Sequence, residues 1–133
     1  LSSHCMSLRG KPVQAQTIAD SISVDLPRDG VRAVRAASQT GGTYVTVKDA
    51  DILAAIADLG RVGIFAEPAG STALAGLKKA LVEGIVKPDD PVVVMNTGSG
   101  LKDVRAAMQA VREAPVIEPS MSALKKHLES VAP

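Results

Sequence analysis

The chain has 133 residues, of which 46% are hydrophobic, and its 15 basic and 14 acidic residues give a net charge of +1. This is enough for one domain with a packed core, whereas the balanced charge and an aromatic content of 2% exclude a basic face or a stacking platform for nucleic acid. No apolar run reaches the roughly 20 residues of a membrane helix and no signal peptide is visible, so we expect a cytoplasmic protein with no nucleic-acid or membrane partner.

Residues 1–16 show neither helical nor strand periodicity and begin with Leu1 instead of methionine. They are predicted to be an irregular lead-in to a piece of a longer chain. The single cysteine, Cys5, cannot form an intrachain disulfide or a multi-cysteine metal site, so no metal is expected. Its neighbour His4 could serve as a base, but no helix or strand positions the pair, and we interpret it as incidental.

The segment from Thr17 to Val24 mixes small and β-branched residues, and its type is ambiguous. Pro27, Arg28 and Asp29 are predicted to open a helix, which Gly41 and Gly42 end. Three apolar residues at helical spacing form one face of that helix: Val31, Val34 and Ala37.

Tyr44–Val47 alternates with β-branched residues and predicts a short strand. Asp49 is expected to be the N-cap of a helix that Gly60 ends. The inner residues of this helix recur at helical spacing: Ile52, Ile56 and Leu59.

A short apolar run at 64–66 leads into Glu67-Pro68, and a proline at this place predicts a helix that begins at Pro68. Gly84 is expected to end it. Small residues line one face of this helix, with leucines beside them: Ala69, Ala73, Gly76 and Ala80, then Leu74, Leu77 and Leu81.

Pro91–Met95 is a continuous β-branched run, typical of a parallel strand buried on both faces, and it leads into a loop at 96–100. Asp103 is predicted to cap the next helix, with an apolar inner face: Val104, Ala107, Met108 and Val111. After Pro115 and Pro119, a last helix carries a narrow stripe that suggests docking onto a body: Met121, Leu124 and Leu128.

Helices that alternate with buried strands indicate an α/β fold, here with an incomplete sheet for so many helices. We expect an irregular segment at 1–16, an α/β region at 17–114 and a C-terminal tail with a docking helix at 115–133.

The loop after the 91–95 run is the first candidate site, because ligands of open α/β sheets bind beyond the carboxyl ends of strands. Gly98 and Gly100 allow close backbone approach, and Thr97 and Ser99 offer hydroxyls. The same pattern also suits a tight turn. A dinucleotide fingerprint is weaker, because Asp103 stands where its third glycine would be.

Glu67 is the second candidate, because a carboxylate stands at a junction between an extended segment and a helix. Such a residue is by default an N-cap that the helix dipole favours. A role facing a ligand is the alternative, and the local pattern leaves both open.

Five segments occur in a specific order and spacing: TIADSISV from Thr17, TGG from Thr40, DADIL from Asp49, GIFAEPAGSTALAGL from Gly63 and TGSGLKD from Thr97. Together, over residues 14–111, they resemble the C-terminal portion of the threonine synthase family.

This resemblance implies the C-terminal part of the large domain of a fold type II, tryptophan synthase beta-like, enzyme that uses pyridoxal 5′-phosphate. The implied reaction converts O-phospho-L-homoserine and water to L-threonine and phosphate. Thr97 matches the hydroxyl residue at the pyridine nitrogen, Gly98 the close backbone approach, and Glu67 a nearby carboxylate. Ser21 matches a small residue near a ring face, although relatives often have glycine or alanine there.

The family's Schiff-base lysine and glycine-rich phosphate loop lie upstream and have no counterpart here, so no catalytic residue is assigned to this chain. We expect the chain by itself to be inactive and to require the missing N-terminal part, in a homo-oligomer. Lys102 belongs to the C-terminal signature and is predicted to be solvated or structural. Alternatives are a threonine or serine dehydratase, which usually has Ser-Gly-Gly-Asn at TGSGLKD, a cysteate synthase, or a stand-alone small-ligand regulatory domain.

Overall fold

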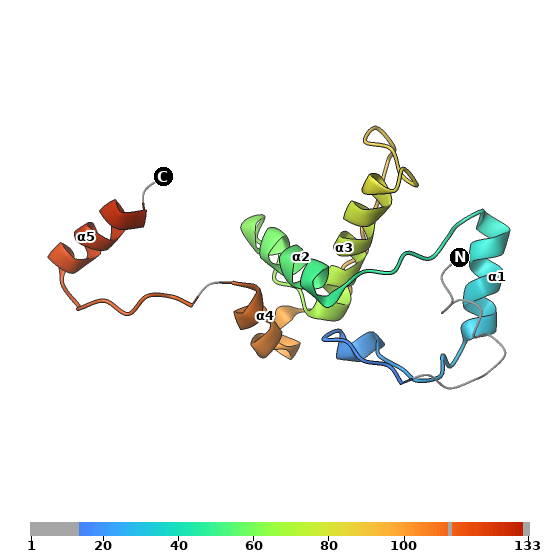
Figure 1. Cartoon of the computed structure of the whole chain (residues 1–133), viewed down its shortest axis with the longest axis horizontal. Helices are drawn as coiled ribbons and strands as arrows, with labels where there is room; N and C mark the ends of the chain where they lie inside the picture. Colours follow the sequence, from blue (N-terminus) through green and yellow to red (C-terminus); the bar gives the residue numbers. More distant parts are fainter. Residues whose placement is uncertain (1–13, 112, 132–133) are drawn as a thin grey trace.

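The computed structural model describes residues 14–111 and 113–131, which form helices joined by extended segments (Figure 1). The elements in chain order are η2 (Asp20–Ile22), α1 (Gly30–Thr40), α2 (Asp49–Arg61), α3 (Pro68–Val82), η3 (Gly100–Lys102), α4 (Val104–Ala110) and α5 (Met121–Val131). None of these helices is long and apolar enough to cross a membrane, a finding limited to the residues that the structure describes.

The centre of the molecule is the pair α2 and α3, with α4 packed on α2 and η2 on α3 (Figure 1). The hydrophobic core of this central part consists of four residues that are nearly inaccessible to solvent: Ala19, Ile52, Ala55 and Ala75. Most of these side chains are small, so the helices approach closely and Ile52 provides much of the buried apolar volume.

Proline and glycine residues correctly predicted the start of α3 and the ends of α1 and α3. α3 begins at Pro68 as predicted, and α1 stops at Gly41, which has a left-handed φ of 69°. Gly84, with a φ of 69°, follows the end of α3. A residue with a side chain is strained at such φ values, so glycine at these positions releases the chain from the helix.

The prediction for the limits of α2 was wrong at both ends. Gly60 lies within the helix, and the chain turns away at Gly63, where φ is 81°. The N-cap is Lys48 instead of Asp49. The Asp49 carboxylate instead accepts hydrogen bonds from Thr17 Oγ1 at 2.6 Å and Ile18 N at 3.1 Å, and so attaches the preceding segment to α2.

Periodicity was a poorer guide to which helix faces are covered. Asp103 caps α4 as predicted, by accepting a hydrogen bond from Ala106 N at 3.0 Å, but Ala106 is its buried residue while the expected inner residues Val104 and Met108 are exposed. On α3, the buried residues are Pro68, Gly70, Ser71, Ala75 and Ala80, so only the last belongs to the predicted face.

The helices of the predicted α/β fold are present, whereas the incomplete sheet is not formed. Tyr44–Val47 and Pro91–Met95 have no regular secondary structure, and no strand occurs within residues 14–111 and 113–131. Val93 is 93% exposed and Met95 73%, the opposite of a strand buried on both faces. A strand requires neighbouring strands for its backbone groups, and the described part of the chain provides none beside these segments.

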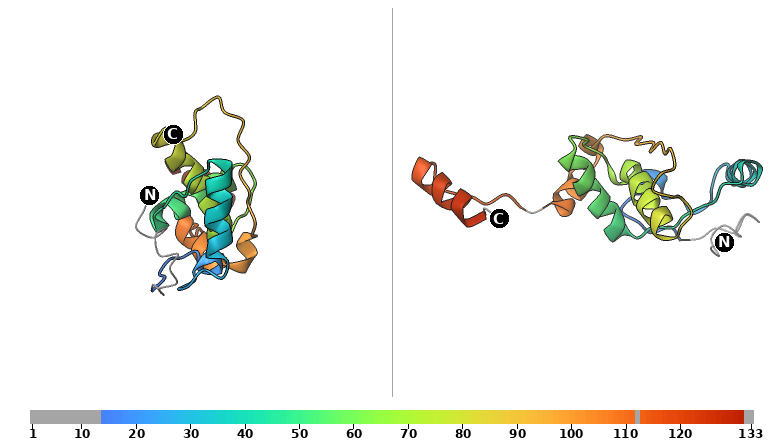
Figure 2. Two further views of the ribbon diagram at one scale, coloured as in Figure 1. Left: turned by 90° about the vertical axis from the view of Figure 1, so that its right-hand side faces the viewer. Right: turned by 90° about the horizontal axis from the view of Figure 1, so that it is seen from above.

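α1 and α5 lie away from the central helices in Figure 1 and in the right-hand view of Figure 2. Neither has a buried residue. The α5 stripe is exposed, with Met121 at 67% and Leu128 at 55%, so the docking of this helix stays a prediction.

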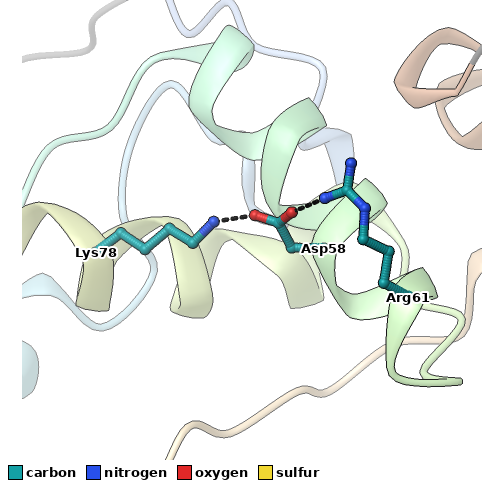
Figure 3. Close-up of polar contacts among 3 residues, drawn as sticks. All are labelled: Asp58, Arg61 and Lys78. Carbon is teal, nitrogen blue, oxygen red and sulfur yellow. Dashed lines mark hydrogen bonds and ion pairs between the residues drawn. The ribbon is translucent and has the colours of Figure 1, made fainter. Parts of the chain in front are cut away.

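Asp58 connects the two central helices on their solvent side. Its carboxylate accepts hydrogen bonds from Lys78 on α3 and Arg61 on α2 (Figure 3). The hydrogen bond from Lys78 is the main cause that lowers the pKa of Asp58 below its ordinary value of 3.8, against a smaller opposing effect of burial and with further help from the charges of Lys78 and Arg61.

We expect Asp58→Asn to reduce the stability of the chain slightly at neutral pH. A carboxyl with a lowered pKa in the folded state stabilises the fold above its unfolded pKa, and this stabilisation is lost as the pH falls through the folded pKa. The difference between wild type and variant should therefore shrink below about pH 4 and at high salt. Urea unfolding at several pH values and two salt concentrations measures it. A difference that persists unchanged at acidic pH would contradict the ion pair as its source.

Candidate functional site

The candidate site forms where the segment before α3 meets the loop that returns after it. Ala66 and Ser99 form an antiparallel bridge. Glu67 N donates to Gly98 O at 3.0 Å, and Gly100 N donates to Phe65 O at 3.0 Å. These bonds hold the 97–100 loop against the first turn of α3, although the two segments are far apart in sequence.

Two glycines make this contact possible. A Cβ on Gly98 would lie 1.7 Å from Glu67 Oε1, and a Cβ on Gly100 would lie 2.3 Å from the ring of Phe65. Real Cβ atoms do not approach other atoms so closely, so a side chain at Gly98 would displace the end of the Glu67 side chain, and one at Gly100 would displace the ring of Phe65. The glycines therefore serve close packing within the chain.

Glu67 occupies the N-cap position of α3 but does not act as a cap through its side chain. Its backbone is extended, with φ −76° and ψ 164°, and its carboxylate makes no capping hydrogen bond. The side chain turns instead toward Gly98 and forms an ion pair with Lys102, whose Nζ lies 3.4 Å from Oε1. Glu67 is nevertheless only 4% exposed. The interpretation of Glu67 as the N-cap residue is thus confirmed for its position, although its side chain does not cap the helix.

The two hydroxyls of the loop have different surroundings. Ser99 Oγ accepts a hydrogen bond from Leu101 N at 3.3 Å and so shapes the turn into η3. Thr97 is exposed, and no residue of the described ranges forms a hydrogen bond with its side chain. Ser99 thus has a structural contact, whereas Thr97 is exposed and has no side-chain hydrogen bond among the described residues.

The structure brings Thr97, Gly98 and Glu67 together but does not join Ser21 to them by a hydrogen bond. Ser21 lies on η2, which packs against α3, and its Oγ donates to Asp20 Oδ1 at 3.2 Å. It therefore lies on a neighbouring element, exposed to solvent.

Sequence reasoning missed two neighbours of this site. Lys102, expected to be solvated or structural, pairs with the buried carboxylate of Glu67, and only the charge of a lysine within the loop motif could have suggested it. Ser71 lies one turn after Glu67 on α3 and is fully buried, and its Oγ has no hydrogen-bond partner among the described residues. Nothing in the sequence distinguishes this serine from the small residues around it.

The described residues contain no group of three or more histidine, cysteine, aspartate or glutamate residues that could hold a metal ion. What the site offers is the exposed hydroxyl of Thr97, in the loop bonded to the segment of Glu67, and the Glu67 carboxylate, which pairs with the ammonium of Lys102. A hydroxyl can donate a hydrogen bond to an uncharged acceptor such as a ring nitrogen. These residues therefore suit the binding of a ligand more than nucleophilic attack.

Comparison with known proteins identifies the family of the chain. A family described as "Pyridoxal-phosphate dependent enzyme" matches residues 2–98. The chain is 41% identical over 117 residues to a threonine synthase of Methanocaldococcus jannaschii, which covers 87% of this chain and 29% of that protein. It is 35% identical over 112 residues to the threonine synthase of Methanosarcina acetivorans, with 84% and 28% covered. For that of Halalkalibacterium halodurans, the identity is 38% over 108 residues, with 80% and 30% covered.

The chain thus spans 28% to 30% of the length of these three relatives. The family match covers well over half of the chain, and it includes Glu67, Thr97 and Gly98, the residues that the fold brings together. This chain belongs to the family of pyridoxal-phosphate dependent enzymes.

Proposed function

We propose that this chain is the C-terminal portion of a threonine synthase, which converts O-phospho-L-homoserine and water to L-threonine and phosphate with pyridoxal 5′-phosphate. The observation that carries the proposal is the bond between Glu67 N and Gly98 O, which holds the loop that carries the exposed Thr97 against the segment of the buried Glu67. The relatives named threonine synthase support the choice of reaction.

The residues present fit the cofactor by the chemistry of their donors. Thr97 would donate a hydrogen bond to the pyridine nitrogen, and Gly98, which has no side chain, would let the backbone approach beside it. Glu67 would lie near the same edge, and Ser21 near a face of the ring. When bound, pyridoxal 5′-phosphate supplies the electron sink for the reaction, and the protein supplies orientation and electrostatics.

A neutral hydroxyl at the ring nitrogen differs from the carboxylate that many enzymes with this cofactor place there. A hydroxyl carries no charge, so it does not stabilise a protonated nitrogen as a carboxylate would. Thr97 therefore suits an unprotonated nitrogen, to which it donates.

The rest of the protein would supply the Schiff-base lysine and the phosphate-binding loop, so this chain by itself would be inactive. It would also supply the strands that Pro91–Met95 lacks. The exposed β-branched side chains Val92 and Val93 support this step, because joining a sheet would bury them and pair their backbone groups. A homo-oligomer is part of the same proposal.

Replacing Thr97 by valine in the full-length enzyme tests this function. Valine keeps the shape but leaves the nitrogen without its donor, so we expect kcat/KM with O-phosphohomoserine to fall by roughly tenfold to a hundredfold. Steady-state kinetics and the absorption spectrum of the cofactor are the measurements.

Thr97→Ser is the matched control, because it retains the hydroxyl and should keep most of the activity. Unchanged kinetics and spectrum in Thr97→Val would assign Thr97 to the turn instead of the cofactor. If the wild-type enzyme forms no threonine but deaminates threonine or serine, the parent protein is a dehydratase and the proposed reaction is wrong.

A further inference from the structure

An ion pair crosses from the short helix η3 to the beginning of α3. Lys102 Nζ lies 3.4 Å from Glu67 Oε1, and the two side chains differ sharply in burial, with 63% of Lys102 exposed but only 5% of Glu67. The ammonium therefore reaches inward from the surface to a carboxylate that the fold has largely removed from water.

The surroundings of Glu67 make this pair necessary. A buried carboxylate is unfavourable unless a cation or hydrogen-bond donors compensate for its lost hydration. The N-terminal amides of α3 do not compensate for it, because Glu67 makes no capping hydrogen bond. Within the described ranges, Lys102 is the partner that forms an ion pair with Glu67.

The backbone around Lys102 is fixed on both sides. Before it, Ser99 accepts the hydrogen bond from Leu101 N and its carbonyl accepts from Lys102 N at 3.1 Å. After it, Asp103 caps α4, and α4 packs on α2. The position of the lysine is thus determined by the same loop that carries Thr97 and Gly98.

We propose that Lys102 is a positioning residue, which holds the Glu67 carboxylate against Gly98, the neighbour of Thr97 in the chain, and balances its charge. This inference rests on the proposed function, in which Thr97 and Glu67 face the cofactor. Without Lys102, an uncompensated carboxylate would lose its fixed position and repel an anionic cofactor. The lysine acts through Glu67 and need not touch the cofactor.

The test uses Lys102→Met and Lys102→Arg in the full-length enzyme, with Lys126→Met as a matched control. Lys126 is an exposed lysine on α5, far from the site (Figure 1).

Apoenzyme is titrated with pyridoxal 5′-phosphate, and the absorption spectrum of the bound cofactor is recorded in the absence of substrate. We expect Lys102→Met to weaken cofactor binding on the order of tenfold and to shift the absorption band. Lys102→Arg should remain within about threefold of wild type, and Lys126→Met should not differ from it.

A double variant separates positioning from a general structural effect. If Lys102 acts through Glu67, then adding Lys102→Met to Glu67→Gln should change cofactor affinity little beyond Glu67→Gln itself. Unfolding midpoints of all variants are measured in parallel, and Lys102→Gln replaces Lys102→Met if the latter does not fold.

Wild-type affinity and spectrum in Lys102→Met, or losses that simply add in the double variant, would overturn the inference. Failure of this inference can be distinguished from failure of the proposed function. If the proposed function is wrong, the wild-type enzyme forms no threonine. The inference about Lys102 is tested by the titration with pyridoxal 5′-phosphate, which does not depend on the identity of the substrate.

Discussion

Gly98→Ala is expected to abolish most activity of the full-length enzyme by displacing Glu67. The new Cβ would lie 1.7 Å from Glu67 Oε1, 2.2 Å from Cδ and 2.7 Å from Cγ, so the whole end of the side chain must move. The backbone cannot separate freely, because Glu67 N donates to Gly98 O and Gly100 N to Phe65 O. Displacement also breaks the ion pair with Lys102. We expect kcat/KM to fall about 100-fold or more and the free energy of unfolding to decrease by about 1–3 kcal/mol.

Gly76→Ala is the matched control for this substitution. It adds the same methyl group to a glycine in the middle of α3, where a Cβ would meet nothing within 4 Å. Alanine is the better helix former, so this variant should be more stable by about 0.5–1 kcal/mol. The two variants should thus change in opposite directions in urea unfolding, whereas only Gly98→Ala should lose activity. Full activity in Gly98→Ala would show that Glu67 need not lie against Gly98.

The sequence predicted those features of the fold that depend on a few neighbouring residues. Pro68 fixes the start of α3 because its ring suits the first helical position and it needs no amide hydrogen. Gly41 and Gly84 follow the ends of two helices because they adopt positive φ without strain. The spacing of Ile52, Ile56 and Leu59 correctly gave the buried side of α2.

The direction of the Glu67 side chain could not be predicted, because it depends on contacts between segments distant in sequence. Its local pattern favoured a helix cap. In the fold, the missing Cβ of Gly98 leaves space for the carboxylate, and Lys102 compensates its charge. Ser71 illustrates the same limit, since its burial depends on neighbours that no nearby residue reveals.

The two predicted strands do not form, for a related reason. The β-branched residues of Pro91–Met95 favour a strand, but a sheet also needs a partner strand. The propensity to form a strand is a property of the segment itself, whereas strand pairing depends on which other segments lie beside it. On α4, the apolar spacing likewise could not tell which residues α2 covers, and Ala106 is the buried one.

Ile52→Ala is expected to be the most destabilising single change in the core of the chain. Ile52 is 2% exposed and packs with Ala19, Ala55 and Ala75 between α2 and its neighbours. Removing a large buried side chain loses its transfer free energy and leaves a cavity, and the cost is greater where the surroundings cannot collapse. Alanines fixed on helices have no side-chain freedom with which to fill the space. We therefore expect a loss of about 2–5 kcal/mol in the free energy of unfolding, a large part of the 5–15 kcal/mol typical of a domain.

Urea unfolding followed by circular dichroism measures this loss, with Val82→Ala as the control. Val82 is the last residue of α3 and is 88% exposed, so its truncation removes a similar side chain without making a cavity and should change stability by about 0.5 kcal/mol or less. Ile52→Val, which removes one methyl group, should fall between the two at about 0.5–1.5 kcal/mol. Equal effects of Ile52→Ala and Val82→Ala would mean that the contact between α2 and α3 does not stabilise the chain. If the losses instead decrease in the order Ile52→Ala, Ile52→Val and Val82→Ala, the small, alanine-rich interface between α2 and α3 stabilises the chain. The position of α3, and therefore of Glu67, depends on this interface.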